Sequence, residues 1–580
     1  MTRHIIAAAA VLFFGVACRA QVPLVQEGKA AVVIVVAAKA APAEIRAAEE
    51  LRTTLGTITG ATFSIVNDAG DKPAAAIVVG ETRHTVIPPS NRTPLVGPDG
   101  FRIHTTNGSV CLIGGSPRGT MYAATALLEK LGVRYFTPKV TRIPKNPAAV
   151  IPAMDETRNP AFEYREPYFA EAFEKDWAAH LRTNGNSAHL DESTGGKIRY
   201  YPFVHSFDLL IPPAQFAAHP EYFPWIKGKR TGGYVQRCLS NPEVLKLSIE
   251  AVRGWMRSHP EAMIYSVSQN DCHGFCECDA CKAIETKYGN AHSGIYLWFV
   301  NQIAEAVEKD FPDKLIDTLA YQFTEAAPTG IAPRKNVRVR LCPIAVCEAH
   351  PYEKCSAKPT VAFVKALTDW GSLTNTLYIW HYNTDFAHYL LPFPDFDQFP
   401  DSLRLYNRRG VRGVFFEGAY GAGGGGSDAE LRSYVMAKLL WNPQQEARPL
   451  IEDWMAGVYG PAKAPMLAWF DLLHAKARTP DKHLFIYDPP TVHYLTADVL
   501  AQGDKLFDEA VGMAKDDAIV TEYVTKARLC LRYVKLTQNP KGNADLEPFI
   551  ADLKRFGIRD VGEGRPADKW AEEMQKQNGK

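Results

Sequence analysis

The chain carries almost no net charge, and it lacks the patterns that mark several common classes of protein. Its 65 Lys and Arg residues and 64 Asp and Glu residues leave a formal charge of +1, which gives no reason to expect a nucleic-acid partner. After the first twenty residues, no apolar run is long enough to span a bilayer as a helix. The glycine-rich segment 114–119 has neither a dinucleotide-binding nor a phosphate-loop pattern, so it indicates a tight strand-to-helix turn.

The N-terminus has the pattern of a secretory signal over residues 1–20. Arg3 is followed by an almost wholly apolar run, Ile5 to Ala17, and then by small residues. Cleavage after Ala20 would release the protein into the periplasm or the medium, whereas cleavage before Cys18 would leave a lipid anchor at the cell envelope. We therefore expect an exported protein. Loss of Cys18 with the signal would leave ten of the 11 Cys residues, which export allows to form disulfides.

The length of the chain indicates several domains, because 580 residues exceed one compact core. Short strand-like and helical patterns predict an N-terminal α/β accessory domain at 21–150. Helical patterns separated by Pro and Gly predict a C-terminal helical region at 442–580, in which we identify no chemistry. The last twenty residues are charged and are expected to be loosely ordered.

The middle of the chain, 159–441, alternates strand-like and helical segments. This alternation predicts parallel β/α units closed into a (β/α)8 TIM barrel, an α/β fold. The stretch between Asn184 and Asp208 is rich in loop residues, so a long active-site loop is the alternative to the second and third strands. The eight strand-like segments are Phe162–Pro167, Ser187–Leu190, Tyr201–Phe207, Met263–Asp271, Leu315–Glu325, Val337–Ile344, Thr376–Asp385 and Val411–Tyr420.

Candidate catalytic carboxylates stand at the carboxyl ends of these strands, where barrel enzymes place their reactive groups. Glycoside cleavage needs an acid for the leaving oxygen and commonly a second carboxylate. Asp271 is the first choice for the acid, since burial among aromatic rings would raise its pKa. Glu417 is the choice for the second carboxylate and Glu325 is the reserve. The alternatives are that Asp271 caps a helix and that Glu417 only binds a sugar hydroxyl.

Further side chains near the strand ends are candidates for substrate binding. Trp380 and Tyr382 would form an aromatic platform for a sugar, or else belong to the core. His381, between them, is a hydrogen-bond donor or a structural histidine. Arg182 and His205 are additional candidate contacts.

Four cysteines lie within ten residues directly after Asp271. Cys272, Cys276, Cys278 and Cys281 could hold a tetrahedral Zn²⁺ in a structural role. The competing interpretation is disulfides, including a bridge to the cysteines that follow the sixth strand, Cys342, Cys347 and Cys355. In both cases the cluster shapes the loop that bears Asp271, and catalysis requires no cofactor.

A glycine-rich segment, Gly421 to Gly426, follows Glu417 closely. Glycine lets a backbone approach other groups closely. We interpret the segment as a mobile loop able to approach a ligand, or as a plain linker.

Taken together, these motifs resemble bacterial proteins of domain-of-unknown-function family 4838. The resemblance covers most of the chain after Asn159. It rests on the motifs Ser266–Asp271, Cys276-x-Cys278-x-x-Cys281, His219–Phe223, Cys238–Pro242, Tyr378–Tyr382 and Leu440–Pro443. The first domain is similar to the accessory domain of α-glucuronidases and β-N-acetylhexosaminidases, on Gly114-Gly115-x-x-Arg118-Gly119 and Gly132–Phe136.

The resemblance implies a glycosidase barrel and possible roles for several residues. In β-N-acetylhexosaminidases an Asp–Glu pair ends the fourth strand, where the Asp orients the nucleophilic acetamido group and the Glu is the acid. This sequence has Asn270 and Asp271 at that place. By this analogy Asn270 holds the acetamido group, Asp271 is the acid, Tyr382 positions the acetamido oxygen and Glu417 binds hydroxyls. Otherwise Asp271 and Glu417 act as a conventional carboxylate pair.

The sequence thus predicts an exported glycoside hydrolase that acts on the end of a glycan. The sugar would be an N-acetylhexosamine or a uronic acid, and the partner is a glycan substrate. The first alternative is a non-catalytic glycan-binding protein on the same kind of barrel. The second is a metal-dependent hydrolase that uses the cysteine-rich loop.

Overall fold

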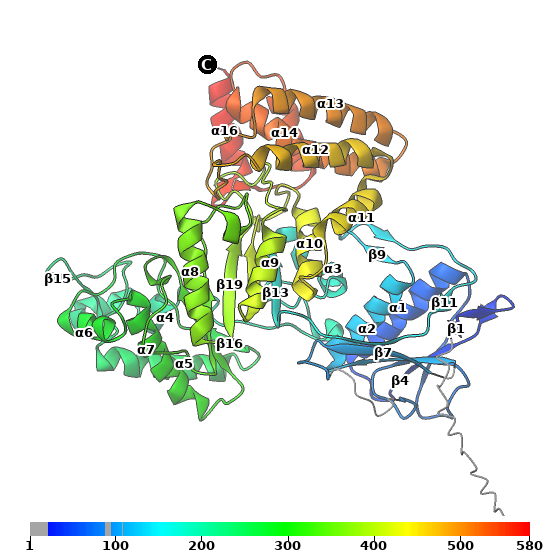
Figure 1. Cartoon of the computed structure of the whole chain (residues 1–580), viewed down its shortest axis with the longest axis horizontal. Helices are drawn as coiled ribbons and strands as arrows, with labels where there is room; N and C mark the ends of the chain where they lie inside the picture. The colour runs from blue at the N-terminus through cyan, green and yellow to red at the C-terminus, as the bar shows by residue number, and fades with distance from the viewer. Residues whose placement is uncertain (1–20, 87–93, 107, 580) are drawn as a thin grey trace, which may run out of the picture. The chain divides into compact units, whose positions relative to one another are not determined.

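The computed structural model describes residues 21–86, 94–106 and 108–579. The predicted signal and Cys18 lie outside the described residues. The chain forms two compact units, one ending at Arg158 and one comprising Arg134–Arg142 and the residues from Asn159 onward (Figure 1). Within the described ranges, no helix is both long and apolar enough to cross a membrane.

The first unit is a six-stranded sheet covered on one face by two helices that contact each other, α1 and α2 (Figure 1). Its glycine-rich turn is sterically required, since a Cβ on Gly114 would lie 2.0 Å from the backbone nitrogen of Thr120. The elements, in sheet order, are β12 (Asp155–Arg158), β7 (Phe101–Thr106), β8 (Ser109–Gly114), β6 (Ala76–Val79), β4 (Val33–Val36) and β5 (Ile65–Asn67), with α1 (Pro42–Thr59) and α2 (Pro117–Lys130).

The second unit contains a curled sheet of six parallel strands, which corresponds to most of a barrel. From β16 to β20, neighbouring strands of the sheet are consecutive along the chain. The first strand, β13, pairs with the last, β20. In sheet order the strands are β13 (Tyr164–Tyr168), β20 (Val411–Glu417), β19 (Leu377–Tyr382), β18 (Val337–Leu341), β17 (Leu315–Ala320) and β16 (Ile264–Ser266). The expected closed barrel of eight strands is therefore not confirmed.

The two missing strands are the second and third of the predicted eight. Ser187–Leu190 and Tyr201–Phe207 form no strand, and a single bridge joins Tyr200 to Ile264 of β16. Side chains take part of the hydrogen bonds that a strand would use: the Ser268 Oγ atom accepts from the His205 N–H at 2.9 Å and the Ser206 Oγ atom accepts from the Ser268 N–H at 3.0 Å, and Pro202 has no N–H to donate. The segment is instead the long loop that was the alternative prediction.

Helices alternate with the strands of this sheet, as the sequence pattern predicted. Figure 1 shows α8 and α9 alongside β19, and α5 and α7 near β16. The principal helices are α5 (Pro242–Ser258), α6 (Asp279–Lys287), α7 (His292–Glu308), α8 (Lys358–Leu373), α9 (Phe399–Arg408) and α10 (Ala429–Trp441).

A buried ion pair occupies the interior of the curled sheet. The guanidinium of Arg340 on β18 lies 2.7 Å from the carboxylate of Asp317 on β17, and these side chains are 1% and 0% exposed. The same guanidinium lies 5.2 Å from the ring of Trp380. Burial raises the pKa of Asp317, and the charge of Arg340 opposes that shift. Polar and aromatic groups thus fill the space below the strand ends.

The C-terminal residues form helices and a small hairpin that contacts the glycine-rich segment. The expectation of a loosely ordered end is wrong, because Trp570 and Met574 are buried in a cluster with Val561. The elements are α11 (Ala447–Tyr459), α12 (Lys463–Ala477), α13 (Ala497–Ala514), α14 (Ala518–Gln538), α15 (Leu546–Arg555), β21 (Asp560–Gly562), β22 (Arg565–Pro566) and α16 (Ala567–Asn578).

The glycine-rich segment, Gly421–Gly426, is the surface on which that hairpin packs. This finding corrects the interpretation of the segment as a ligand-binding loop or a linker. The Arg559 N–H donates to the Ala422 carbonyl at 3.1 Å, and the Ala422 N–H donates to the Asp560 carboxylate at 3.0 Å. A Cβ on Gly423 would lie 1.7 Å from the Gly557 carbonyl oxygen. Glycine is required here because the two backbones touch.

We expect Gly423→Ala to detach the hairpin, with Gly542→Ala as the matched control. Both glycines have positive φ, but a Cβ on Gly542 meets nothing within 4 Å. The control should therefore lose only the left-handed backbone cost of about 1–2 kcal/mol, while Gly423→Ala loses clearly more. Thermal unfolding measures the difference, and hydrogen exchange at 557–566 localises it. Equal losses of stability in the two variants would contradict a steric requirement for glycine at position 423.

Candidate active site

A cavity of about 270 Å³ opens at the carboxyl ends of the parallel strands. Its walls come from the strand ends, from the long loop before β16 and from two segments of the C-terminal region. The lining residues are Val204, His205, Asp271, Leu319, Tyr321, Cys342, Ile344, Trp380, Tyr382, Phe386, Glu417, Tyr487 and Glu563.

Glu417 is the most strongly perturbed carboxyl group of this cavity. It ends β20, and it is only 9% exposed. The indole N–H of Trp380 donates to its Oε2 atom at 2.7 Å. Burial raises the pKa of Glu417 to about 8; the Trp380 hydrogen bond lowers it, while the negative charges of Glu563 and Asp271 raise it. At neutral pH this side chain is therefore mostly protonated and can donate a proton.

Asp271 lines the same cavity, but it is exposed rather than buried among aromatic rings. It lies five residues beyond the end of β16, where its N–H donates to the Tyr234 hydroxyl at 3.0 Å. Burial raises the pKa of the neighbouring Tyr321, and the charge of Asp271 raises it further. The expectation that Asp271 is buried among aromatic rings is therefore wrong.

A third carboxylate, Glu563, was not predicted. It lies in the two-residue turn of the hairpin between β21 and β22, followed by Gly564 with φ of 62°. The Tyr420 hydroxyl donates to its Oε1 atom at 2.7 Å, and its N–H donates to the Phe386 carbonyl at 2.6 Å. The pair Glu563-Gly564 was the local sign of a hairpin turn. Nothing in the sequence indicated that this hairpin reaches the cavity.

Trp380 and Tyr382 face the cavity as the sequence predicted. Alternation along β19 places them on one side of the sheet and His381 on the other. Their ring centroids are 6.2 Å apart and the planes differ by 28°. Together with Phe386 and Tyr487, whose rings are 6.0 Å apart, they supply the aromatic part of the cavity wall. His205 also lines the cavity, with its Nδ1 atom 2.8 Å from the Gln269 carbonyl oxygen.

His381 and Asn270 do not line the cavity. The His381 ring is fully buried, 3.1 Å from the Glu348 carboxylate and 2.8 Å from the Tyr406 hydroxyl, so it is the structural histidine of the alternative prediction. The Asn270 amide donates to the Asp208 carboxylate at 2.5 Å and to a backbone carbonyl. These bonds leave its amide no donor for a substrate acetamido group.

Arg182 and Glu325 also lie outside the cavity lining. The Arg182 guanidinium lies 5.5 Å from the ring of Trp441, which packs at the amino end of β13. Burial raises the pKa of Glu325, and its carbonyl oxygen accepts from the Trp370 indole at 2.8 Å. Neither residue is placed to contact a ligand in this cavity.

Three of the four predicted metal-binding cysteines gather beside α6, with a different fourth member. Cys276, Cys278 and Cys281 group with Cys238, whose sulfur lies 3.8 Å from that of Cys278 and 3.9 Å from that of Cys281. Cys272 is not part of the group, because its sulfur accepts from the Gln236 amide at 3.4 Å. All ten cysteines among the described residues are free thiols, so none of the alternative disulfides is present there.

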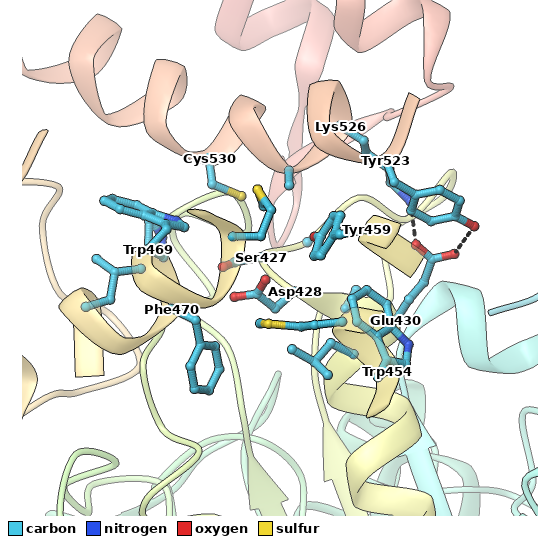
Figure 2. A pocket seen from close by; sticks show the side chains of 18 of the residues that line it. Ser427, Asp428, Glu430, Trp454, Tyr459, Trp469, Phe470, Tyr523, Lys526 and Cys530 are labelled. Atoms are coloured by element: carbon cyan, nitrogen blue, oxygen red, sulfur yellow. Dashed lines mark hydrogen bonds and ion pairs between the residues drawn. The ribbon is translucent and has the colours of Figure 1, made fainter. Parts of the chain in front are cut away.

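A second cavity of about 50 Å³ lies among α10, α11, α12 and α14, and Figure 2 shows its polar groups. The Lys526 ammonium lies 3.5 Å from the Glu430 carboxylate and 3.4 Å from that of Glu171. Burial raises the pKa of Asp428, which faces the same space. The volume admits a few water molecules and is far below the roughly 300 Å³ of small ligand sites. We assign this cavity a structural role.

Several solved structures with a similar fold are glycoside hydrolases. A family GH115 4-O-methyl-α-glucuronidase with specificity for decorated arabinogalactans is 13% identical, with a TM-score of 0.55 over 95% of this chain and 76% of that chain. A GH138 enzyme targeting pectin rhamnogalacturonan II is 10% identical, with a TM-score of 0.50 over 94% and 98%.

An enzyme from Clostridium perfringens, in complex with GlcNAc-α-1,4-galactose, is 12% identical, with a TM-score of 0.50 over 89% of this chain and 64% of that chain. At such low identities these likenesses show a glycosidase-like fold. No match is found among curated proteins.

Two family models match the sequence itself. Residues 20–127 match the N-terminus of glycosyl hydrolase family 67, which confirms the expected likeness of the first domain to that of α-glucuronidases. Residues 135–471, more than half of the chain, match the model described as a domain of unknown function, DUF4838. The chain therefore belongs to the DUF4838 family.

Proposed function

We propose that this protein is an exported glycoside hydrolase that removes one sugar at a time from the end of a glycan, with Glu417 as the general acid. The observation that carries the proposal is the raised pKa of Glu417, at the wall of a cavity with two further carboxylates. The signal pattern of residues 1–20 supports the export part of the proposal. The acid is thus assigned to β20 and not to Asp271.

The two carboxylates of the proposed reaction differ in their surroundings, as acid and partner should. Glu417 is buried and holds its proton near neutral pH, so it can protonate the glycosidic oxygen as the bond to the leaving group breaks. Asp271 is exposed and lines the same cavity, where its carboxylate would stabilise the cationic sugar carbon. The charge of Glu563 helps to keep the Glu417 proton in place.

Cavity size supports action on a terminal sugar. A volume of about 270 Å³ is near the lower end, roughly 300 Å³, of small-molecule sites. Such a space suits one sugar ring against the wall formed by Trp380 and Tyr382. An enzyme that cleaves within a chain would need a longer open groove.

The charges of the lining favour a neutral N-acetylhexosamine over a uronic acid. Asp271, Glu417 and Glu563 are the ionisable acids of the described lining, and that lining contains no Lys or Arg to pair with a sugar carboxylate. Among the structural neighbours, one is a glucuronidase and one holds a GlcNAc-containing disaccharide, so the neighbours alone do not choose between the two sugars.

The first test is hydrolysis of a panel of aryl glycosides by the wild type and by Glu417→Gln. We expect release by the wild type and a loss of kcat of at least about 10²-fold in the variant, the usual contribution of a general acid. Glu325→Gln is the matched control, because it removes a half-buried carboxyl group outside the cavity and should retain activity. A glycan-binding protein without catalysis would release nothing while still binding the sugars.

Within that panel, kcat/KM should be at least about tenfold higher for an N-acetylhexosaminide than for a glucuronide. The physical reason is that the carboxylate of a glucuronide, close to Asp271 and Glu563, adds a further negative charge, which costs more than about 1.4 kcal/mol. Assays at low and high salt provide the control, since screening should narrow the difference. Preference for the glucuronide would show that the charge argument is mistaken.

The pH profile should move in opposite directions in two variants. Because Glu417 acts protonated, kcat/KM of the wild type should fall as pH rises through about 8. Trp380→Phe removes a hydrogen bond that favours the carboxylate, so the pKa of Glu417 and this limb should shift to higher pH. Glu563→Gln removes a repelling charge, so both should shift to lower pH. Shifts of the same sign would exclude Glu417 as the titrating acid.

A further inference from the structure

A second group of side chains that could hold a metal ion is assembled by the fold, and it was not apparent in the sequence. Cys347, His350, Cys355 and His483 each offer one ligand atom, and these four atoms lie within 4.8 Å of one another. Three come from the segment between β18 and α8, and the fourth lies more than 100 residues later, between α12 and α13. The fold therefore assembles a Cys₂His₂ set from two distant parts of the chain.

We propose that these four residues bind a zinc ion that holds the segment bearing Tyr487 at the cavity. The distances fit a tetrahedral ion: with Zn–S near 2.3 Å and Zn–N near 2.05 Å, a sulfur and a nitrogen should be about 3.6 Å apart. The Cys347 sulfur lies 3.4 Å from Nδ1 of His350. The Cys355 sulfur lies 3.8 Å from Nδ1 of His483.

A disulfide accounts for this group less well than an ion does. A bond between Cys347 and Cys355 would leave two imidazoles directed at sulfur atoms without a reason, whereas zinc uses all four ligands. On binding, each thiol releases its proton to solvent and binds as thiolate, and each neutral imidazole binds through Nδ1. No oxidant is required.

The site would couple the C-terminal region to the wall of the cavity. His483 is four residues before Tyr487, and the intervening backbone is already tied on both sides. The Glu348 N–H donates to the Leu484 carbonyl at 2.8 Å, and the Phe386 N–H donates to the Ile486 carbonyl at 2.8 Å. Tyr487 is itself 58% exposed. Its position therefore depends mainly on how firmly this segment is held.

An independent observation supports a second ion, in the group Cys238, Cys276, Cys278 and Cys281. Two sulfur atoms bound to one tetrahedral zinc should be about 3.8 Å apart. The sulfur of Cys238 lies 3.8 Å and 3.9 Å from two of its partners, and a disulfide would need about 2.05 Å. This ion would anchor the loop that follows Asp271. The two sites share no residue, so the proposal for one can fail without the other.

Metal analysis of the purified full-length protein tests both sites. We expect two zinc ions per chain in the wild type, and one in either His483→Ala or Cys278→Ser. Cys272→Ser and Cys342→Ser are matched controls, since both remove a nearby thiol outside the two groups and should keep two ions. An intact mass lower by about 2 Da with no zinc, the signature of a disulfide, would overturn the proposal.

Hydrogen exchange of the wild type with and without a chelator provides a measurement that does not depend on the folding of any variant. Removal of zinc should speed exchange at 484–488 and at 276–281 and leave the first unit unchanged. In His483→Ala only 484–488 should change. Unaltered exchange at 484–488 after proven loss of zinc would show that the ion does not hold Tyr487. Neither outcome depends on whether the cavity is catalytic.

Discussion

The ion pair of Asp317 and Arg340 is the constraint on which the arrangement of the cavity depends. Removing two charges from water is costly, and their attraction compensates only when the geometry is fixed. Arg340 meets that condition with two bonds to one carboxylate and with Trp380 beside its guanidinium. Trp380 in turn donates to Glu417. The position of the proposed acid is therefore set by a chain of contacts that begins in the interior of the sheet.

Local sequence patterns were sufficient to predict the strands and helices whose apolar residues recur with the period of the element. Six of the eight predicted strands and the main helices formed because their apolar residues have the period of those elements. Tyr201–Phe207 has a similar pattern, but Pro202 has no N–H to donate, and the side chains of Ser206 and Ser268 replace backbone groups as acceptors. A single sequence does not show such long-range competition.

The site was predictable where position along a strand decides exposure. Asp271, Glu417, Trp380, Tyr382 and His205 line the cavity because they stand at strand ends or in the loop beside them. The same period of two that directs Trp380 inward directs His381 outward. The placement of His381 outside the cavity could therefore have been predicted from the sequence. Glu563, Tyr487 and Cys238 were not predictable, because folding brings them from distant segments. The burial of Glu417 and the exposure of Asp271 also depend on such contacts.

The hairpin that carries Glu563 has a consequence for the order in which the cavity can form. Its turn is separated from β20 by the whole helical region, so the contact between them closes a long loop of chain. The sheet does not need this contact, but the cavity lacks one wall until the hairpin docks on Gly421–Gly426. A chain that lost the hairpin would keep its sheet and lose a carboxylate. Docking of the hairpin thereby becomes a condition for completion of the site.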